Sequence, residues 1–397
     1  MTWHAYLVRT MTGHVGRRIT SSAGAGGAWS IMLNGIEEAS ITVHASALER
    51  LGRDWWTPWK AAVLLTHDGP RGEVPMILGP LVKPVDQVGE KVTLTVRGIG
   101  SILDRRVVLD GDFVREGDRP TAADMDALAK SRVSLRGRAL GTIARDVVEL
   151  STDGKAAGRL PIRYGTPREQ RAGLNERNYE VHNLANNGTW KRLTELAEVI
   201  NGPDFMFRPA WADETHTMVE WVMVHGTAAQ PTIGQDDRRV VLDATVAKPV
   251  IADVAVTTDA GETTNRVYWT GAGEGAGVLI RAAQDLTAFG DGMPLLETVG
   301  STSDSDNPAL VQAHADAALA RGLTTAVQYT GTVDLGDRRT APGSWYVGDA
   351  AELILAGRVD VPNGRRSVRI IAAKGSLGSD QVTLELEHEG GPENGAA

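Results

Sequence analysis

Four alternating glycines in the segment GAGEGAG have the composition of a loop that holds a phosphate. They are Gly271, Gly273, Gly275 and Gly277. A P-loop ends in Gly-Lys-Ser/Thr, because the lysine and the hydroxyl must meet phosphate and magnesium, and no segment of the chain has this ending. The G-x-G-x-x-G spacing that opens a helix is also missing, and Glu274 would repel a phosphate. The segment is therefore predicted to be a hairpin between two strands.

Two acidic segments contain side chains that bind metals. Asp213, Glu214 and His216 lie within four residues in ADETH, a predicted turn between strands. Successive strand residues point to opposite faces, so these three are predicted to form a solvated turn and no metal site. Asp304 and Asp306 in DSDNP resemble the start of a calcium loop, but the glycine and the later glutamate of that loop are missing. A helix cap explains this segment better.

Three tryptophans in RDWWTPWK have rings on which a sugar could stack: Trp55, Trp56 and Trp59. A compact apolar corner shaped by Pro58 is the favoured interpretation, because tryptophan prefers half-buried sites. The G-x-S-x-G elbow of serine hydrolases is absent. Carboxylate pairs for glycoside hydrolysis depend on distances in space, so that alternative stays open. We assign no catalytic, cofactor-binding or metal-binding residue and expect no cofactor.

Composition narrows the class of protein. The chain has 397 residues, room for two or three domains, with 42% hydrophobic and 23% charged residues. Its 45 glycines suit many turns between short strands, and the absence of cysteine excludes disulfides and thiolate chemistry. A net charge of -9 argues against a protein whose function is to bind DNA or an anionic membrane. The sequence has no signal-peptide core and no apolar run that spans a bilayer, so stable membrane association is not expected.

Strand patterns dominate the first part of the chain. In KVTLTVRGI, Val92, Leu94 and Val96 fall on one face, as a half-buried antiparallel strand requires. Further strands are predicted at His4 to Arg9, Trp29 to Leu33, Ser40 to His44, Ala61 to Thr66 and Met76 to Val82, with turns such as Asn34-Gly35 between them. We predict an N-terminal β-barrel-like domain over residues 1–105.

Residues 106–250 are predicted to form an α+β region. Helical stretches are expected near Asp124 to Arg132 and Leu140 to Leu150. Another helix is expected in NGTWKRLTELAEVING, with Thr189 as a possible N-cap and Gly202 just past its end. The segments FMFRPAW and TMVEWVMVHG follow it as a hairpin.

Residues 251–397 are predicted to form a C-terminal β domain with one crossing helix over 307–322. Asn307 caps this helix and Pro308 occupies its first position, where a missing N–H costs nothing. Four strands are expected after it. The predicted fold is thus a β-rich α+β protein, with two barrel-like antiparallel β domains at the chain ends and an α+β middle.

Several phrases together resemble the tail hub, or minor tail protein, of long-tailed phages that infect actinobacteria, the ReqiPepy-type hub family. They are WSIMLNGIEEASITV (29–43), TPWKAAVLLTHDG (57–69), ILGPLV (77–82), KVTLTVRGIGSILDRR (91–106), NGPDFMFRP (201–209), WVMVHG (221–226), NRVYWTGAGEGAG (265–277) and the closing VTLELE. Each phrase is weak by itself, but their order and spacing cover most of the chain.

The resemblance implies a structural protein of the virion, located at the tail tip or baseplate and similar in architecture to contractile-phage baseplate hubs. It implies a homotrimeric ring that connects the tail tube to the host-facing tip and through which DNA passes. Expected neighbours are the distal tail protein, the tape-measure protein and receptor-binding or tip proteins. Two alternatives remain: a tail-associated cell-wall hydrolase, a glycosidase or peptidase, and a carbohydrate-binding module.

Overall fold

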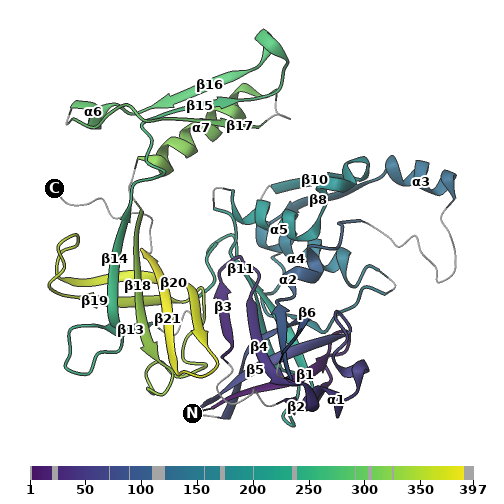
Figure 1. Ribbon diagram of the computed structural model, residues 1–397. Helices are drawn as coiled ribbons and strands as arrows, with labels where there is room; N and C mark the ends of the chain where they lie inside the picture. Colours follow the sequence, from purple (N-terminus) through teal and green to yellow (C-terminus); the bar gives the residue numbers. More distant parts are fainter. Residues whose placement is uncertain are drawn as a thin grey trace.

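The computed structural model describes residues 2–19, 26–70, 72–88, 90–109, 121–155, 157–169, 175–199, 201–234, 239–290, 292–302, 306–323 and 326–388. Across these ranges thirteen strands hydrogen-bond into one sheet, which three smaller sheets accompany (Figure 1). The prediction of a β-rich α+β protein is confirmed in outline. No helix in the described ranges is long and apolar enough to cross a membrane.

The N-terminal part is built from strands with short helical turns between them. They are β1 (Trp3–Arg9), β2 (Val15–Ile19), β3 (Ala28–Met32), β4 (Glu38–His44), α1 (Ala45–Glu49), η1 (Arg53–Trp55), β5 (Ala61–Gly69), β6 (Gly72–Gln87), β7 (Lys91–Arg97) and α2 (Gly100–Leu103). The predicted alternation in β7 is confirmed, because Val92, Leu94 and Val96 are buried. The sequence analysis did not predict β2, whose centre holds the exposed Arg17 and Arg18.

Strand β5 is the centre of the molecule because both of its faces are buried. Val63 and Leu65 belong to a core shared with the C-terminal strands, whereas Ala62 and Leu64 belong to a second core shared with the middle of the chain. The run AAVLLTH therefore lacks polar alternation for a physical reason: neither face meets water. One strand holds two cores together.

The C-terminal strands continue the same sheet. They are β13 (Val240–Asp243), β14 (Ala252–Asp259), β18 (Ala326–Asp334), β19 (Ala350–Leu355), β20 (Gly364–Ser376) and β21 (Gln381–His388). Strand β20 pairs with β3, so the two ends of the chain share one sheet. The main path of paired strands runs from β14 to β2, and in the described ranges it closes no barrel. Where the sequence predicted two barrel-like domains, the described residues therefore form one open, continuous sheet.

The middle of the chain contains more strand than predicted. Its elements are α3 (Ala122–Ala129), β8 (Arg132–Arg138), α4 (Leu140–Ser151), β9 (Ile162–Tyr164), β10 (Asn175–Glu180), η2 (Val181–Asn186), α5 (Thr189–Ala197), β11 (Phe205–Trp211) and β12 (Val219–His225). The hairpin of β11 and β12 is confirmed. The helix near Asp124 was predicted to end at Arg132. This end is wrong, because α3 ends at Ala129 and Arg132 begins β8.

The predicted ends of helix α5 also need correction. Gly188 is the N-cap and makes no side-chain capping bond, while Thr189 is already helical and fully buried. The helix ends at Ala197, well before Gly202. Thr189 does not cap the helix because it is already the first helical residue, one position after the N-cap.

A small arm is inserted between β14 and β18 and is drawn in green at the top of Figure 1. It consists of β15 (Arg266–Thr270), η3 (Gly275–Gly277), β16 (Ile280–Gln284), α6 (Thr287–Gly290), β17 (Glu297–Ser301) and α7 (Pro308–Gly322). Helix α7 covers one face of the three-stranded sheet, where Val267, Ala283 and Ala315 are buried. The predicted crossing helix is confirmed, with the Asn307 side chain accepting a bond from the Ala309 amide at 3.0 Å.

Candidate functional site

The glycine-rich segment is a hairpin loop, as predicted. Strands β15 and β16 pair antiparallel, and the Gly271 amide donates to the Leu279 carbonyl at 2.7 Å. Gly273 has φ 129° and Gly275 has φ 55°, backbone conformations that favour glycine. A Cβ on Gly273 would lie 2.4 Å from the Gly277 carbonyl oxygen. The shape of the turn explains these two glycines without a bound phosphate.

The ADETH segment is a closed turn. The Asp213 carboxylate accepts bonds from the Thr217 amide at 2.9 Å and the Thr215 hydroxyl at 3.2 Å. The hydrogen bond from the Thr217 hydroxyl is the main cause of the lowered pKa of Asp213. His216 stacks on Trp211, with ring centroids 4.2 Å apart. These hydrogen bonds confirm the predicted turn. In the described ranges no group of three or more His, Asp or Glu side chains is placed to hold a metal ion.

The DSDNP segment is described only in part. Asp306 is exposed next to the N-terminus of α7, and Asp304 lies outside the described residues. The side chain of the following Asn307 caps the helix. The capping interpretation is confirmed for the described part of the segment.

The three tryptophans form a packed corner. Trp55 and Trp56 pack against the core shared by β5 and the C-terminal strands, and all three rings are half-buried. An arginine covers each ring: Arg9 Cζ lies 4.0 Å from the Trp55 centroid, Arg53 Cζ 3.7 Å from Trp56, and Arg105 Cζ 4.9 Å from Trp59. Each guanidinium group occupies one face of its ring, a face on which a sugar would otherwise stack. The predicted apolar corner is confirmed for Trp55 and Trp56, which pack against this core.

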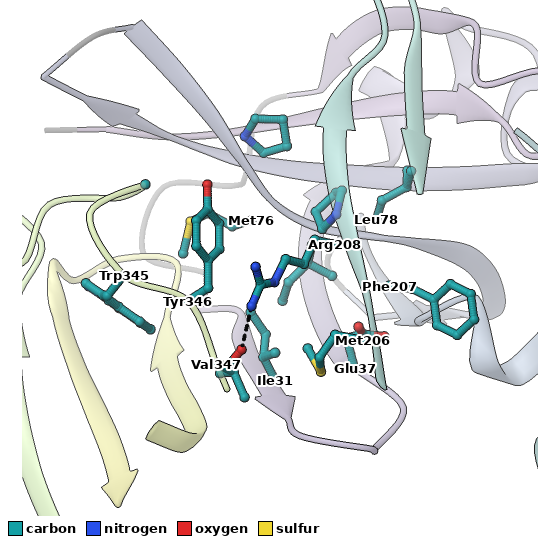
Figure 2. A pocket seen from close by; sticks show the side chains of 14 residues that line it. Ile31, Glu37, Met76, Leu78, Met206, Phe207, Arg208, Trp345, Tyr346 and Val347 are labelled. Atoms are coloured by element: carbon teal, nitrogen blue, oxygen red, sulfur yellow. Dashed lines mark hydrogen bonds between the residues drawn. The ribbon is translucent and has the colours of Figure 1, made fainter. Parts of the chain in front are cut away.

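At one junction, which no sequence pattern indicated, three distant parts of the chain meet. Figure 2 shows a cavity there, walled by β3 and β6, by β11, and by the 343–347 loop that precedes β19. Its volume is about 40 Å³, room for about one or two water molecules. Most of its wall is apolar, including Ile31, Met76 and Met206. A cavity of this volume holds water molecules but has no room for a larger ligand.

Glu37 is the acidic group of this cavity. It is 8% exposed, and its carboxyl lies against Gly98, where a Cβ would fall 1.8 Å from Glu37 Oε2. Burial raises the pKa of Glu37 to about 7, although a hydrogen bond from its own backbone amide opposes the shift. Near neutral pH this carboxyl therefore exists as a mixture of acid and carboxylate.

Arg208 is the basic group of the same cavity and links β11 to the C-terminal loop. Its Nη2 donates to the Val347 carbonyl at 3.2 Å and lies 3.6 Å from Asp349 Oδ1. Its Cζ lies 4.7 Å from the centroid of the Tyr346 ring, as Figure 2 shows. Burial lowers the pKa of Arg208, opposed by the charge of Asp349. Arg208 thus joins β11 to the loop that precedes β19.

A second contact at the junction is centred on Asp204, at the start of β11. Its carboxylate accepts from the Asn34 side-chain amide at 3.2 Å and from the Ile233 backbone amide at 3.2 Å. It also forms an ion pair with Arg369 of β20. Asn34 in turn accepts from the Phe205 amide at 2.7 Å and adopts φ 55°. The Asn34-Gly35 turn was predicted, but its long-range partners have no local signal in the sequence.

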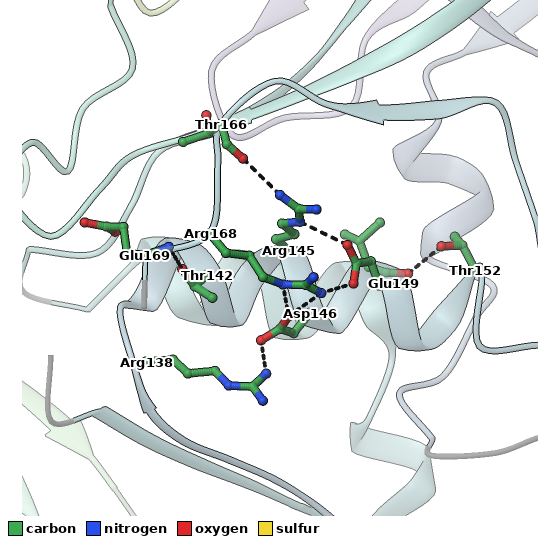
Figure 3. Close-up of polar contacts among 10 residues, drawn as sticks. Arg138, Thr142, Arg145, Asp146, Glu149, Thr152, Thr166, Arg168 and Glu169 are labelled. Carbon is green, nitrogen blue, oxygen red and sulfur yellow. Dashed lines mark hydrogen bonds and ion pairs between the residues drawn. The ribbon is translucent and has the colours of Figure 1, made fainter. Parts of the chain in front are cut away.

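A network of arginines and carboxylates surrounds helix α4 (Figure 3). Asp146 is 4% exposed, pairs with Arg138 and accepts from Arg168 Nε at 3.0 Å. Glu149 pairs with Arg145 at 2.9 Å and also with Arg168. Each of the two carboxylates has two guanidinium partners, so the network holds the segment after β9 against α4.

We expect Asp146→Asn to lower the free energy of unfolding by about 2 kcal/mol, because the amide accepts only one of the two charge-assisted bonds well. Urea denaturation followed by circular dichroism measures this. Asp153→Asn is the control: Asp153 pairs with Arg159 at 3.9 Å and both side chains are at least half-exposed, so stability should not change. Equal losses in the two variants would contradict the clamping role of Asp146.

Comparison with known proteins gives a likeness of fold. No protein-family model matches the sequence, and no curated protein matches it either. The tail protein from Neisseria meningitidis MC58 is similar with a TM-score of 0.54 at 13% identity, over 98% of each chain. The 43 kDa tail protein of prophage MuSo2 from Shewanella oneidensis is similar with a TM-score of 0.56 at 9% identity, also over 98% of each chain. The chain has the fold of these two tail proteins over nearly its whole length.

Proposed function

We propose that this chain is a structural component of a phage virion, located at the tail tip or baseplate. The observation that carries the proposal is the fold shared with two phage tail proteins over 98% of each chain. The contacts at the junction and around α4 agree with a structural role, because Asp204 and Arg208 at the junction and Asp146 on α4 each join separate segments. Arginine side chains stack on the rings of Trp55 and Trp56, which makes a carbohydrate-binding module the less favoured alternative.

Within the tail, we infer that the protein is the hub. Three copies would form a ring that connects the tail tube to the host-facing tip, with the N-terminal and C-terminal β regions as its wall. The distal tail protein, the tape-measure protein and the receptor-binding or tip proteins would be its neighbours. The net charge of -9 supports a conduit from which DNA is not retained by phosphate contacts. The phrases quoted above favour a long-tailed phage of actinobacteria.

Light scattering of the purified chain, together with negative-stain images, tests whether three copies form the proposed ring. We expect three times 42.3 kDa, about 127 kDa, and rings with a central hole. A monomer at the highest soluble concentration would contradict a self-assembling trimer. Antibody labelling of whole virions tests the location in the tail separately from trimer formation. Label at one end of the tail supports the proposed location, whereas label along the tube or on the head contradicts it.

A further inference from the structure

The arm between β14 and β18 has a hydrophobic core of its own. Val267, Ala283 and Ala315 are buried between its sheet and α7, and among the described residues this cluster is separate from the two larger cores. In Figure 1 the arm is joined to the body, meaning the main sheet and the regions packed on it, through the ends of β14 and β18. The packing that holds the arm together therefore lies within the arm.

Directed contacts hold helix α7 on the arm sheet. The Trp269 ring of β15 stacks on His314 of α7, with ring centroids 5.3 Å apart, and Trp269 Nε1 donates to the Thr302 hydroxyl at 2.7 Å. Gln312 of α7 donates to the Ala282 carbonyl of β16 at 3.0 Å. Because the helix is bound to two different strands, helix and sheet form one unit.

Two buried polar residues, Thr264 and Asn265, close the base of the arm. They are 4% and 1% exposed. The Thr264 amide donates to the Gly322 carbonyl at 2.8 Å, and the Thr264 hydroxyl lies 3.0 Å from the Leu296 carbonyl oxygen. Asn265 Nδ2 donates to the Pro294 carbonyl at 3.0 Å, and its Oδ1 accepts from the Leu296 amide at 2.9 Å. The chain that enters the arm, the chain that leaves it and the loop before β17 are therefore tied together.

The connection below this base is a two-stranded stem. In the part of the chain that the structure describes, the ladder between β18 and β21 begins at Gln328. The last two pairs of β14 with β18, Thr258–Val327 and Asp259–Ala326, therefore lie beyond the main sheet as a two-stranded ribbon. Such a ribbon is at most marginally stable by itself. The stem is thus the weakest part of the path from the body to the arm.

We propose that the arm moves as one rigid lever on this stem, with its pivot in residues 257–263. The turn at the top of the stem is held by local bonds alone: the Gly261 amide donates to Asp259 Oδ1 at 2.8 Å, and the Thr263 amide donates to the Ala260 carbonyl at 3.1 Å. Bending there breaks no contact of the arm core or of the two larger cores. This inference goes beyond the proposed function and does not depend on trimer formation.

The motion carries a partly apolar surface with it. Fifteen large apolar side chains are exposed in the described residues, and several of them lie on the arm, among them Ile280, Val299 and Leu310. A lever of this kind presents these side chains at different distances from the body.

Distances between pairs of spin labels, measured by pulsed electron paramagnetic resonance on frozen protein, test the lever. The chain has no cysteine, so introduced cysteines are unique labelling sites. Ser301→Cys on β17 and Val241→Cys on β13, both at exposed positions, connect the arm to the body. We expect a broad distance distribution for this pair, because frozen molecules keep the different positions of the arm.

Two control pairs reuse the same sites, so that local motion of the labels is matched. Ser301→Cys with Ala320→Cys lies within the arm, and Met32→Cys with Val241→Cys lies within the body, all at exposed positions. Both pairs should give narrow distributions. An arm-to-body distribution as narrow as these would overturn the proposal, and so would a within-arm distribution as broad as the arm-to-body one, since the arm would then not be rigid.

Native-state hydrogen exchange supplies a second readout, which needs no labels. Asn265→Ala removes the bonds that tie the base, so we expect the amides of β15, β16 and α7 to exchange about tenfold faster while those of β5 keep their rates. Loss of all protection in the arm, with β5 still protected, would be the strongest form of this result. Exposed Glu262→Gln is the control and should match the parent. Equal acceleration in β5, or none in the arm, would contradict an arm that opens independently of the body.

Discussion

Replacing Glu37 with glutamine should raise the free energy of unfolding at pH 8 by about 3 kcal/mol, because the native protein then no longer buries a carboxylate. The folded pKa is about 7 and the ordinary value is 4.5. Between these values the folded state binds the proton and the unfolded state does not. Stability of the parent therefore falls as pH rises from 4.5 to 7 and is level beyond it.

The same reasoning gives no difference between parent and Glu37→Gln below pH 4.5, where the carboxyl is neutral in both states. Urea denaturation at a series of pH values measures the two curves. Glu38→Gln is the control on the neighbouring position, since Glu38 pairs with Arg97 at 2.9 Å and both side chains are more than a third exposed. A pH profile of Glu37→Gln parallel to that of the parent would disprove the buried titration.

Trp221→Ala should cost about 4 kcal/mol of stability, as large-to-small changes in a full core do. Trp221 is 1% exposed on β12 and lies in the core shared by the middle region and β5. Its Nε1 donates to the Leu78 carbonyl at 2.9 Å, so the substitution also leaves that buried oxygen unpaired. Chemical denaturation followed by far-ultraviolet circular dichroism measures the loss.

Trp221→Phe separates the two contributions. It keeps an aromatic ring in the core but removes the donor to Leu78, and we expect a loss of about 1 to 2 kcal/mol. If the alanine and phenylalanine variants lost equal stability, the hydrogen bond rather than the packing would fasten the middle region to β6.

The elements that the sequence predicted well are those whose apolar pattern matches their burial. Strand β7 alternates because one face is buried, and Asn307 with Pro308 marks the start of α7 by local chemistry alone. The β8–β10 ribbon was missed because charges hold its outer face: Arg136 pairs with Glu176 at 2.9 Å, and Ser134 donates to Asn178 at 2.7 Å. Only Val133 and Leu135 mark an apolar alternation in β8, and two positions are too few to predict a strand.

The local backbone turns at the candidate sites were the easier part to predict. The hairpin at GAGEGAG and the turn at Asp213 follow from local rules of backbone conformation. The junction could not be predicted, because Asp204 pairs with Arg369, and Glu37 comes to line the cavity, only after three regions have folded together. A glutamate in a short polar stretch gives no sign that its carboxyl is buried. Burial by residues far away in the sequence is what raises its pKa.

The pairing of β3 with β20 also has a consequence for how the chain is made. Residues 28–32 leave the ribosome long before their partners at 372–376 are synthesised. The N-terminal sheet therefore waits with an unpaired edge at β3 until residues 372–376 have followed, and closing this contact carries the entropy cost of a very long loop. Chains truncated before β20 keep this edge exposed, so they should be retained by chaperones and excluded from assembly.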